Sequence, residues 1–160
     1  MIIVVMGVSG SGKTTVGQQL ATQLGWSFID ADDFHPAVNV AKMGRGEPLS
    51  DSDRRPWLVT LQTAIAEWSA AEKNVVLACS ALRASYRQML DGKGVRWVYL
   101  RGDPAVIGDR LQARSSHFMP PALLESQFEA LEPPTPAEAL IVDIGPETST
   151  IVEVIYSQLF

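Results

Sequence analysis

The sequence predicts an α/β fold with a parallel central sheet, and three observations lead to this prediction. The chain has 160 residues, 46% of them hydrophobic, which suits one domain with a sizeable core. Five apolar runs have the length of strands, and four of them lack polar alternation, as is typical of strands buried on both faces. Segments of helical length separate these runs, and such alternation predicts a three-layer, doubly wound domain.

The predicted elements alternate along the chain. A strand over residues 2–6 leads into a helix over 13–24, which Gly25 can cap at its C-terminus. In the helix expected over 53–71, leucine, isoleucine and tryptophan recur at helical spacing. The other strands are expected over 27–30, 74–79, 95–100 and 139–143, and the other helices over 81–90, 104–113 and 147–159.

Two regions depart from this alternation. They cover about residues 31–52, after the second strand, and about 114–136, which is rich in proline. In an α/β sheet, ligands bind beyond the carboxyl ends of the strands. We therefore expect a single domain over 1–160, with a substrate-binding insertion at 31–52 and a lid at 114–136.

The segment GVSGSGKT, residues 7–14, matches the phosphate-binding pattern G-x-x-x-x-G-K-[ST] at every fixed position. It lies between a predicted strand and a predicted helix, so its backbone N–H groups and the helix N-terminus can hold phosphate oxygens. Lys13 can reach the β- and γ-phosphates of ATP, and the Thr14 hydroxyl can bind Mg²⁺. The predicted nucleotide site comprises Gly7, Ser9, Gly10, Ser11, Gly12, Lys13, Thr14 and Thr15.

Two aspartates follow the second predicted strand. Asp30 and Asp32 would point the same way along an extended chain. One carboxylate is then expected near the metal, and the other is expected to receive the proton of an acceptor hydroxyl.

Arginines are clustered after the predicted strands. Arg83 and Arg87 are four residues apart, as are Arg110 and Arg114, so we expect each pair to share a helix face. Guanidinium groups there can bind a substrate carboxylate or neutralise the transferring phosphoryl group.

Composition and motifs exclude several classes. The formal charge of −5 disfavours nucleic-acid binding through a general basic surface. The guanine-reading pattern N-K-x-D is absent from the sequence. The apolar run at the N-terminus is far too short for a signal peptide or a membrane span, so we expect a cytoplasmic protein without membrane contact.

Three long segments make a resemblance specific. They are DADDFHPAVNVAKMGRGEPLSDSDRRPWL (30–58), CSALRASYRQML (79–90) and HFMPPALLESQFEALEPP (117–134). With the phosphate-binding motif they resemble the gluconate kinases over well over half of the chain. This resemblance implies an adenylate-kinase-like fold with a short mobile lid, a homodimer, and ATP-dependent phosphorylation of D-gluconate on its 6-hydroxyl.

The resemblance also implies roles for individual residues. Lys13, Asp32 and Arg114 are the expected catalytic residues, and Arg110 is expected to contact ATP from the lid side. Thr14 and Asp30 are expected at the metal. The residues expected to bind the sugar acid are Asp30, Asp32, His35, Lys42, Arg54, Arg83 and His117.

Other readings of the sequence stay open at this point. A shikimate-kinase-like enzyme also phosphorylates a hydroxylated carboxylic acid and can use two aspartates after the second strand, but the long match over 30–58 argues against it. A nucleoside monophosphate kinase lacks a recognisable base-reading segment here. A regulatory nucleotide switch would hydrolyse ATP slowly without any acceptor, whereas a kinase requires one.

Overall fold

The computed structural model describes residues 1–113 and 121–160, and its centre is a five-stranded sheet. The strands lie in the order β2-β3-β1-β4-β5, and all neighbouring pairs are parallel. This confirms the predicted α/β class. The strands are β1 Ile2–Met6, β2 Ser27–Asp30, β3 Val75–Ala78, β4 Val95–Arg101 and β5 Leu140–Asp143.

Helices follow each strand, and their bounds agree with the sequence pattern to within a few residues. Helix α1 ends where Gly25 adopts a left-handed φ of 68° and donates its N–H to the Ala21 and Thr22 carbonyls, as expected of a C-cap. The helices are α1 Lys13–Leu24, α2 Ala37–Gly44, α3 Asp51–Ala70, α4 Ala84–Leu90, α5 Pro104–Ala113, α6 Pro121–Ala130 and α7 Thr148–Leu159, with a short 3-10 helix η1 at Ala31–Phe34.

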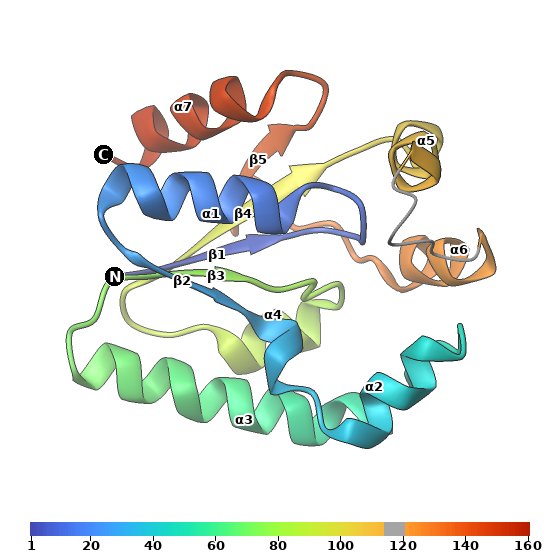
Figure 1. The fold of residues 1–160 in the computed structure, drawn as a ribbon. Helices are drawn as coiled ribbons and strands as arrows, with labels where there is room; N and C mark the ends of the chain where they lie inside the picture. The colour runs from blue at the N-terminus through green and yellow to red at the C-terminus, as the bar shows by residue number, and fades with distance from the viewer. Residues whose placement is uncertain (114–120) are drawn as a thin grey trace.

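The central strand β1 supplies side chains to both layers of the core. Ile2, Val4 and Met6 pack on the side of α3 and α4, whereas Ile3 and Val5 pack on the side of α1 and α7. Successive strand residues point to opposite faces, so an uninterrupted apolar strand requires cover on both. Figure 1 shows this arrangement, with α1 and α7 together on one face and α3 and α4 on the other.

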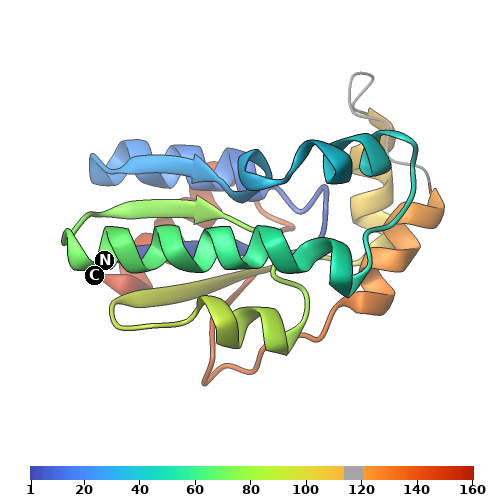
Figure 2. The same cartoon turned by 90° about the horizontal axis from the view of Figure 1, so that it is seen from below.

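Three helices gather beyond the carboxyl end of β1. Helices α2, α5 and α6 lie at the end of the molecule toward which the β1 arrow points in Figure 1, and the view from below in Figure 2 places them at the same end. Helix α2 belongs to the expected insertion at 31–52, and α6 belongs to the expected lid at 114–136. The phosphate-binding loop between β1 and α1 lies at this same end (Figure 1).

One local expectation is wrong. The chain after Asp30 does not continue in an extended conformation, because η1 begins at Ala31. The Asp30 side chain accepts a hydrogen bond from the Asp32 backbone N–H at 2.9 Å and caps this helix. Strand alternation therefore does not set the directions of Asp30 and Asp32.

None of the helices that the structure describes has both the length and the apolar character needed to cross a membrane.

Candidate active site

The phosphate-binding loop joins β1 to α1 and has the backbone that its glycines allow. Gly10 and Gly12 have φ values of 80° and 96°, in the left-handed region that other residues rarely adopt. A Cβ atom on Gly10 would lie 2.8 Å from Cγ of Leu111, so α5 packs directly against the loop. The loop geometry therefore requires glycine both for its turn and for this close approach.

The polar groups of the loop fit a bound phosphate. The Ser11 hydroxyl is buried and makes no hydrogen bond to any described residue. The Lys13 ammonium donates to the Val8 carbonyl at 2.9 Å, and Lys13 begins α1. A cation and unpaired donors at a helix N-terminus are the groups that hold the phosphates of a nucleotide. The residues of the loop are thus compatible with ATP.

A contact across 118 residues ties α6 to the same loop. The Gln127 side-chain oxygen accepts the Ser9 backbone N–H at 2.7 Å, and its amide nitrogen donates to the Ser9 hydroxyl at 3.0 Å. Ser9 is one of the residues expected to bind the nucleotide. Helix α6, which lies within the expected lid, therefore contacts the phosphate-binding loop directly.

The carboxylates after β2 lie against this loop. The Thr14 hydroxyl donates to Asp30 Oδ2 at 3.3 Å, which brings the two residues expected at the metal together. Within the described ranges, three or more histidine, cysteine or acidic side chains do not converge on a common point. Mg²⁺ at a nucleotide usually takes one or two protein ligands and completes its shell with phosphates and water, so Thr14 and Asp30 fit such an ion.

The pKa of the Asp32 carboxyl group is raised above its usual value. The Asp32 side chain is 73% exposed, yet protein surrounds it closely enough for desolvation to raise its pKa. The neighbouring Asp30 carboxylate raises this pKa further, and the Lys13 ammonium opposes both effects. A carboxylate with a raised pKa is a better proton acceptor, as the expected role of Asp32 requires.

His35 lies behind Asp32 and is almost buried, with a side chain 4% exposed. Its ring stacks on Trp57, with 4.4 Å between centroids and 13° between planes, and its Nε2 is 3.9 Å from Asp32 Oδ1. Burial, with a smaller effect from the cationic Arg54, lowers the pKa of His35 from 6.5 to about 4. His35 is therefore neutral near pH 7 and cannot serve as a cationic carboxylate ligand.

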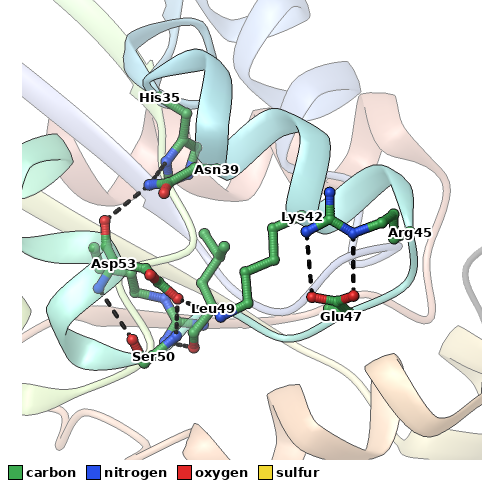
Figure 3. A network of polar contacts seen from close by, with 9 residues as sticks. His35, Asn39, Lys42, Arg45, Glu47, Leu49, Ser50 and Asp53 are labelled. Atoms are coloured by element: carbon green, nitrogen blue, oxygen red, sulfur yellow. Dashed lines mark hydrogen bonds and ion pairs between the residues drawn. The ribbon is translucent and has the colours of Figure 1, made fainter.

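A polar network joins α2 to the start of α3 (Figure 3). Lys42 Nζ donates to Asp53 Oδ2 at 2.7 Å, and Asp53 also forms a capping box with Ser50. These hydrogen bonds hold the pKa of Asp53 near 2, with Lys42 the largest influence. Lys42, expected to bind the sugar acid, is thus paired with Asp53, and its side chain is 30% exposed.

The two arginines expected to bind the acceptor lie around Asp51 and Tyr86. Arg83 Nε is 3.3 Å from Asp51 Oδ1, and the Tyr86 hydroxyl donates to the same oxygen. Arg54 lies over the Tyr86 ring at 5.9 Å and donates to the Leu49 carbonyl at 2.7 Å. The start of α3 and the loop before α4 therefore bring these two guanidinium groups to one place.

The arginine pairing expected after β3 is wrong. Arg83 is the N-cap residue of α4, whereas Arg87 lies inside the helix, is buried and donates to the Ala81 and Leu82 carbonyls. The two side chains do not form one guanidinium face. Arg87 instead holds the turn where Ala81 has a φ of 43°.

The lid side is described only in part. Arg110 Nη2 donates to the Ile144 carbonyl at 2.5 Å, beyond the end of β5. Arg114 and His117 fall outside the described residues.

Sequence reasoning missed three residues of this region. Asn39 and Trp57 contact His35, and Gln127 contacts Ser9. Asn39 is four residues after His35, but His35 precedes α2, so helical spacing does not indicate this contact. The other two contacts join distant segments, and nothing local in the sequence marks them.

A separate groove of about 560 Å³ lies at the other end of the sheet, near the starts of β4 and β5. Arg87, Asp91, Arg96 and Glu138 are among its lining residues, and none of the residues expected to bind substrate or nucleotide belongs to it.

The parallel sheet, the glycine loop at a helix N-terminus and the carboxylates beside it define a P-loop kinase of small molecules. The model of the shikimate kinase family matches residues 9–134. The "Probable gluconokinase" of Xenopus tropicalis is 45% identical, and the match covers 99% of this chain and 93% of that protein. The chain belongs to the gluconokinase family of P-loop kinases.

Solved structures agree with this placement. An unliganded sugar kinase from Janibacter sp. HTCC2649 matches with a TM-score of 0.92 and 39% identity, over 99% of this chain and 93% of that one. A gluconokinase from Sinorhizobium meliloti 1021 matches with a TM-score of 0.83 and 41% identity, over 99% and 97%. Shikimate kinase structures, at 16–22% identity, share the fold alone.

Proposed function

We propose that this protein transfers the γ-phosphoryl group of ATP to the 6-hydroxyl of D-gluconate and releases 6-phosphogluconate and ADP. Membership of the gluconokinase family supports the choice of acceptor. One structural observation carries the reaction type: the Thr14–Asp30 hydrogen bond joins the phosphate-binding loop to the carboxylates after β2. A phosphoryl donor and a hydroxyl acceptor would therefore meet at this junction.

The residues have complementary roles in this proposal. Lys13 and the loop N–H groups neutralise charge on the phosphates, and Asp32 orients the acceptor hydroxyl and takes its proton. Arg114 is proposed to stabilise the transferring group, and Arg110 to contact the nucleotide. Transfer of this kind depends on positioning and charge stabilisation, so a covalent nucleophile is not required.

The acceptor is proposed to lie between η1, α2 and the start of α3. Lys42, Arg54 and Arg83 supply positive charge for the carboxylate, together with His117 from the lid. His35 is neutral near pH 7, so we assign it to a hydroxyl rather than to the carboxylate. A linear polyol with one carboxylate needs both kinds of partner.

Mg²⁺ is the proposed metal, held by Thr14 and Asp30. Bound Mg²⁺ would supply positive charge that offsets the negative charge of the phosphates. The enzyme is further proposed to act in the cytoplasm as a homodimer, which light scattering would show as about twice the 17.4 kDa chain mass.

A coupled ADP-release assay with Mg·ATP tests the proposal. The acceptors compared are D-gluconate, shikimate, neutral sugars, nucleoside monophosphates and none, with Lys13→Met as the inactive control. We expect ADP release only with gluconate, and only from the wild type. Release with shikimate instead would favour the alternative kinase, and acceptor-independent release would favour a nucleotide switch.

A further inference from the structure

Asn39 contacts the His35 ring on one side and the Asp53 backbone on the other. It is 2% exposed and projects from α2 between His35 and the start of α3 (Figure 3). Its Nδ2 donates to the Asp53 carbonyl at 2.8 Å and lies 3.2 Å from His35 Nδ1.

The orientation of the Asn39 amide follows from its partners. A backbone carbonyl oxygen can only accept a hydrogen bond, so the atom facing the Asp53 carbonyl must be the amide nitrogen. The same nitrogen faces His35 Nδ1, which must then accept. An accepting Nδ1 carries no proton, so the neutral imidazole carries its proton on Nε2.

The ring is also held in place. The stack on Trp57 fixes its plane, and Trp57 is itself anchored by a hydrogen bond of 2.7 Å from Nε1 to the Ala31 carbonyl. Nε2 lies on the side of Asp32, 3.9 Å from Oδ1. The protonated nitrogen of His35 is therefore the one that lies near the carboxylate that we propose as the proton acceptor.

We propose that Asn39 is a positioning residue that fixes His35 as the Nε2–H tautomer, so that this N–H faces Asp32 and the acceptor beside it. In this form His35 donates a hydrogen bond and cannot take a proton from the acceptor, which leaves that task to Asp32. The proposal rests on the proposed function because it needs an acceptor at Asp32.

The surrounding charges favour this state. Burial is the main cause of the lowered pKa of His35, and the positive charge of Arg54 lowers it further. Asp32 is the anion that faces Nε2. On the other side, Asp53 presents its carbonyl to Asn39, while its carboxylate is paired with Lys42. Protonation of Nδ1 would place its N–H against the N–H group of the Asn39 amide, and two donors cannot form a hydrogen bond with each other.

Long-range ¹H–¹⁵N NMR spectra of the wild-type protein give the first test, because they distinguish protonated from unprotonated ring nitrogens. The chain has only two histidines, and the His35 signals are assigned by their loss in His35→Gln. We expect a single neutral tautomer with the proton on Nε2 near pH 7. A proton on Nδ1, or a charged ring at that pH, overturns the proposal.

The isosteric variant Asn39→Asp gives the second test. Its carboxylate would accept from Nδ1, so His35 should take the Nδ1–H tautomer or become charged, with a raised pKa. With gluconate as acceptor, kcat should fall by about tenfold or more, the loss expected for one critical hydrogen bond, whereas KM for ATP should stay near the wild-type value.

Asn74→Asp is the matched control, because it makes the same chemical change at an exposed side chain, whose oxygen accepts a hydrogen bond from the N-terminal amine. It should behave as the wild type in both measurements.

An Asn39→Asp protein that keeps the Nε2–H tautomer and wild-type kinetics contradicts the proposal. If Asn39→Asp does not fold, the wild-type spectrum decides. If wild-type protein does not use gluconate, the proposed function fails, while the spectrum still reports on Asn39.

Discussion

Burial of a neutral His35 should make the stability of the protein depend on pH. The pKa of His35 is about 4 in the folded state, against 6.5 for an unperturbed histidine. As the pH falls through this interval, the unfolded chain binds a proton that the folded protein does not bind. The free energy of unfolding therefore decreases on acidification and is restored above pH 6.5.

The size of this effect follows from the two pKa values. At about pH 5, proton binding by His35 in the unfolded chain raises the equilibrium constant of unfolding about thirtyfold, which lowers the free energy of unfolding by about 2 kcal/mol. At about pH 7.5 this effect is negligible. The ring is 4% exposed, so solvent screens little of this difference.

Urea unfolding of wild type and His35→Gln at about pH 5 and about pH 7.5 isolates this contribution. Other groups titrate in both proteins, and glutamine does not titrate. The stability advantage of wild type over His35→Gln should shrink by about 2 kcal/mol between the higher and the lower pH. It should stay constant between about pH 7.5 and 8.5. Parallel pH profiles across the whole range would refute the reasoning.

Three further predictions concern other parts of the site. Trp57→Phe removes the indole N–H that donates to the Ala31 carbonyl, so urea unfolding should show a loss of about 0.5–1.5 kcal/mol; an unchanged midpoint would contradict this. Gly10→Ala combines a left-handed φ of 80° with a clash against Leu111, so nucleotide titration should show greatly weakened ATP binding, and tight binding would count against the loop assignment. Cys79 is buried and its pKa is about 12, so iodoacetamide near pH 8 should label it only after unfolding; rapid labelling of native protein would be the contrary result.

The sequence predicts the sheet well because its signals are local. Each residue of β1 is buried, and the uninterrupted apolar run indicated a strand covered on both faces. Gly25 ends α1 as its position suggested. The glycine-rich motif identified the loop because its residue types are needed for the turn itself.

The side-chain arrangement of the site could not be predicted in the same way. The turn after Asp30 depends on a side-chain hydrogen bond to Asp32, which competes with extension of the strand. The contact between Gln127 and Ser9 and the stack of His35 on Trp57 depend on the packing of separate elements. The hydrophobic periodicity of the sequence does not predict contacts between such distant side chains.

Phosphorus NMR of the reaction mixture tests the central claim most directly. Wild-type protein is incubated with Mg·ATP and D-gluconate, and the new signal is correlated with the protons of the sugar acid. We expect one phosphomonoester coupled to the C6 protons, formed together with ADP. Inorganic phosphate alone, or an ester on a different hydroxyl, would contradict the proposed transfer.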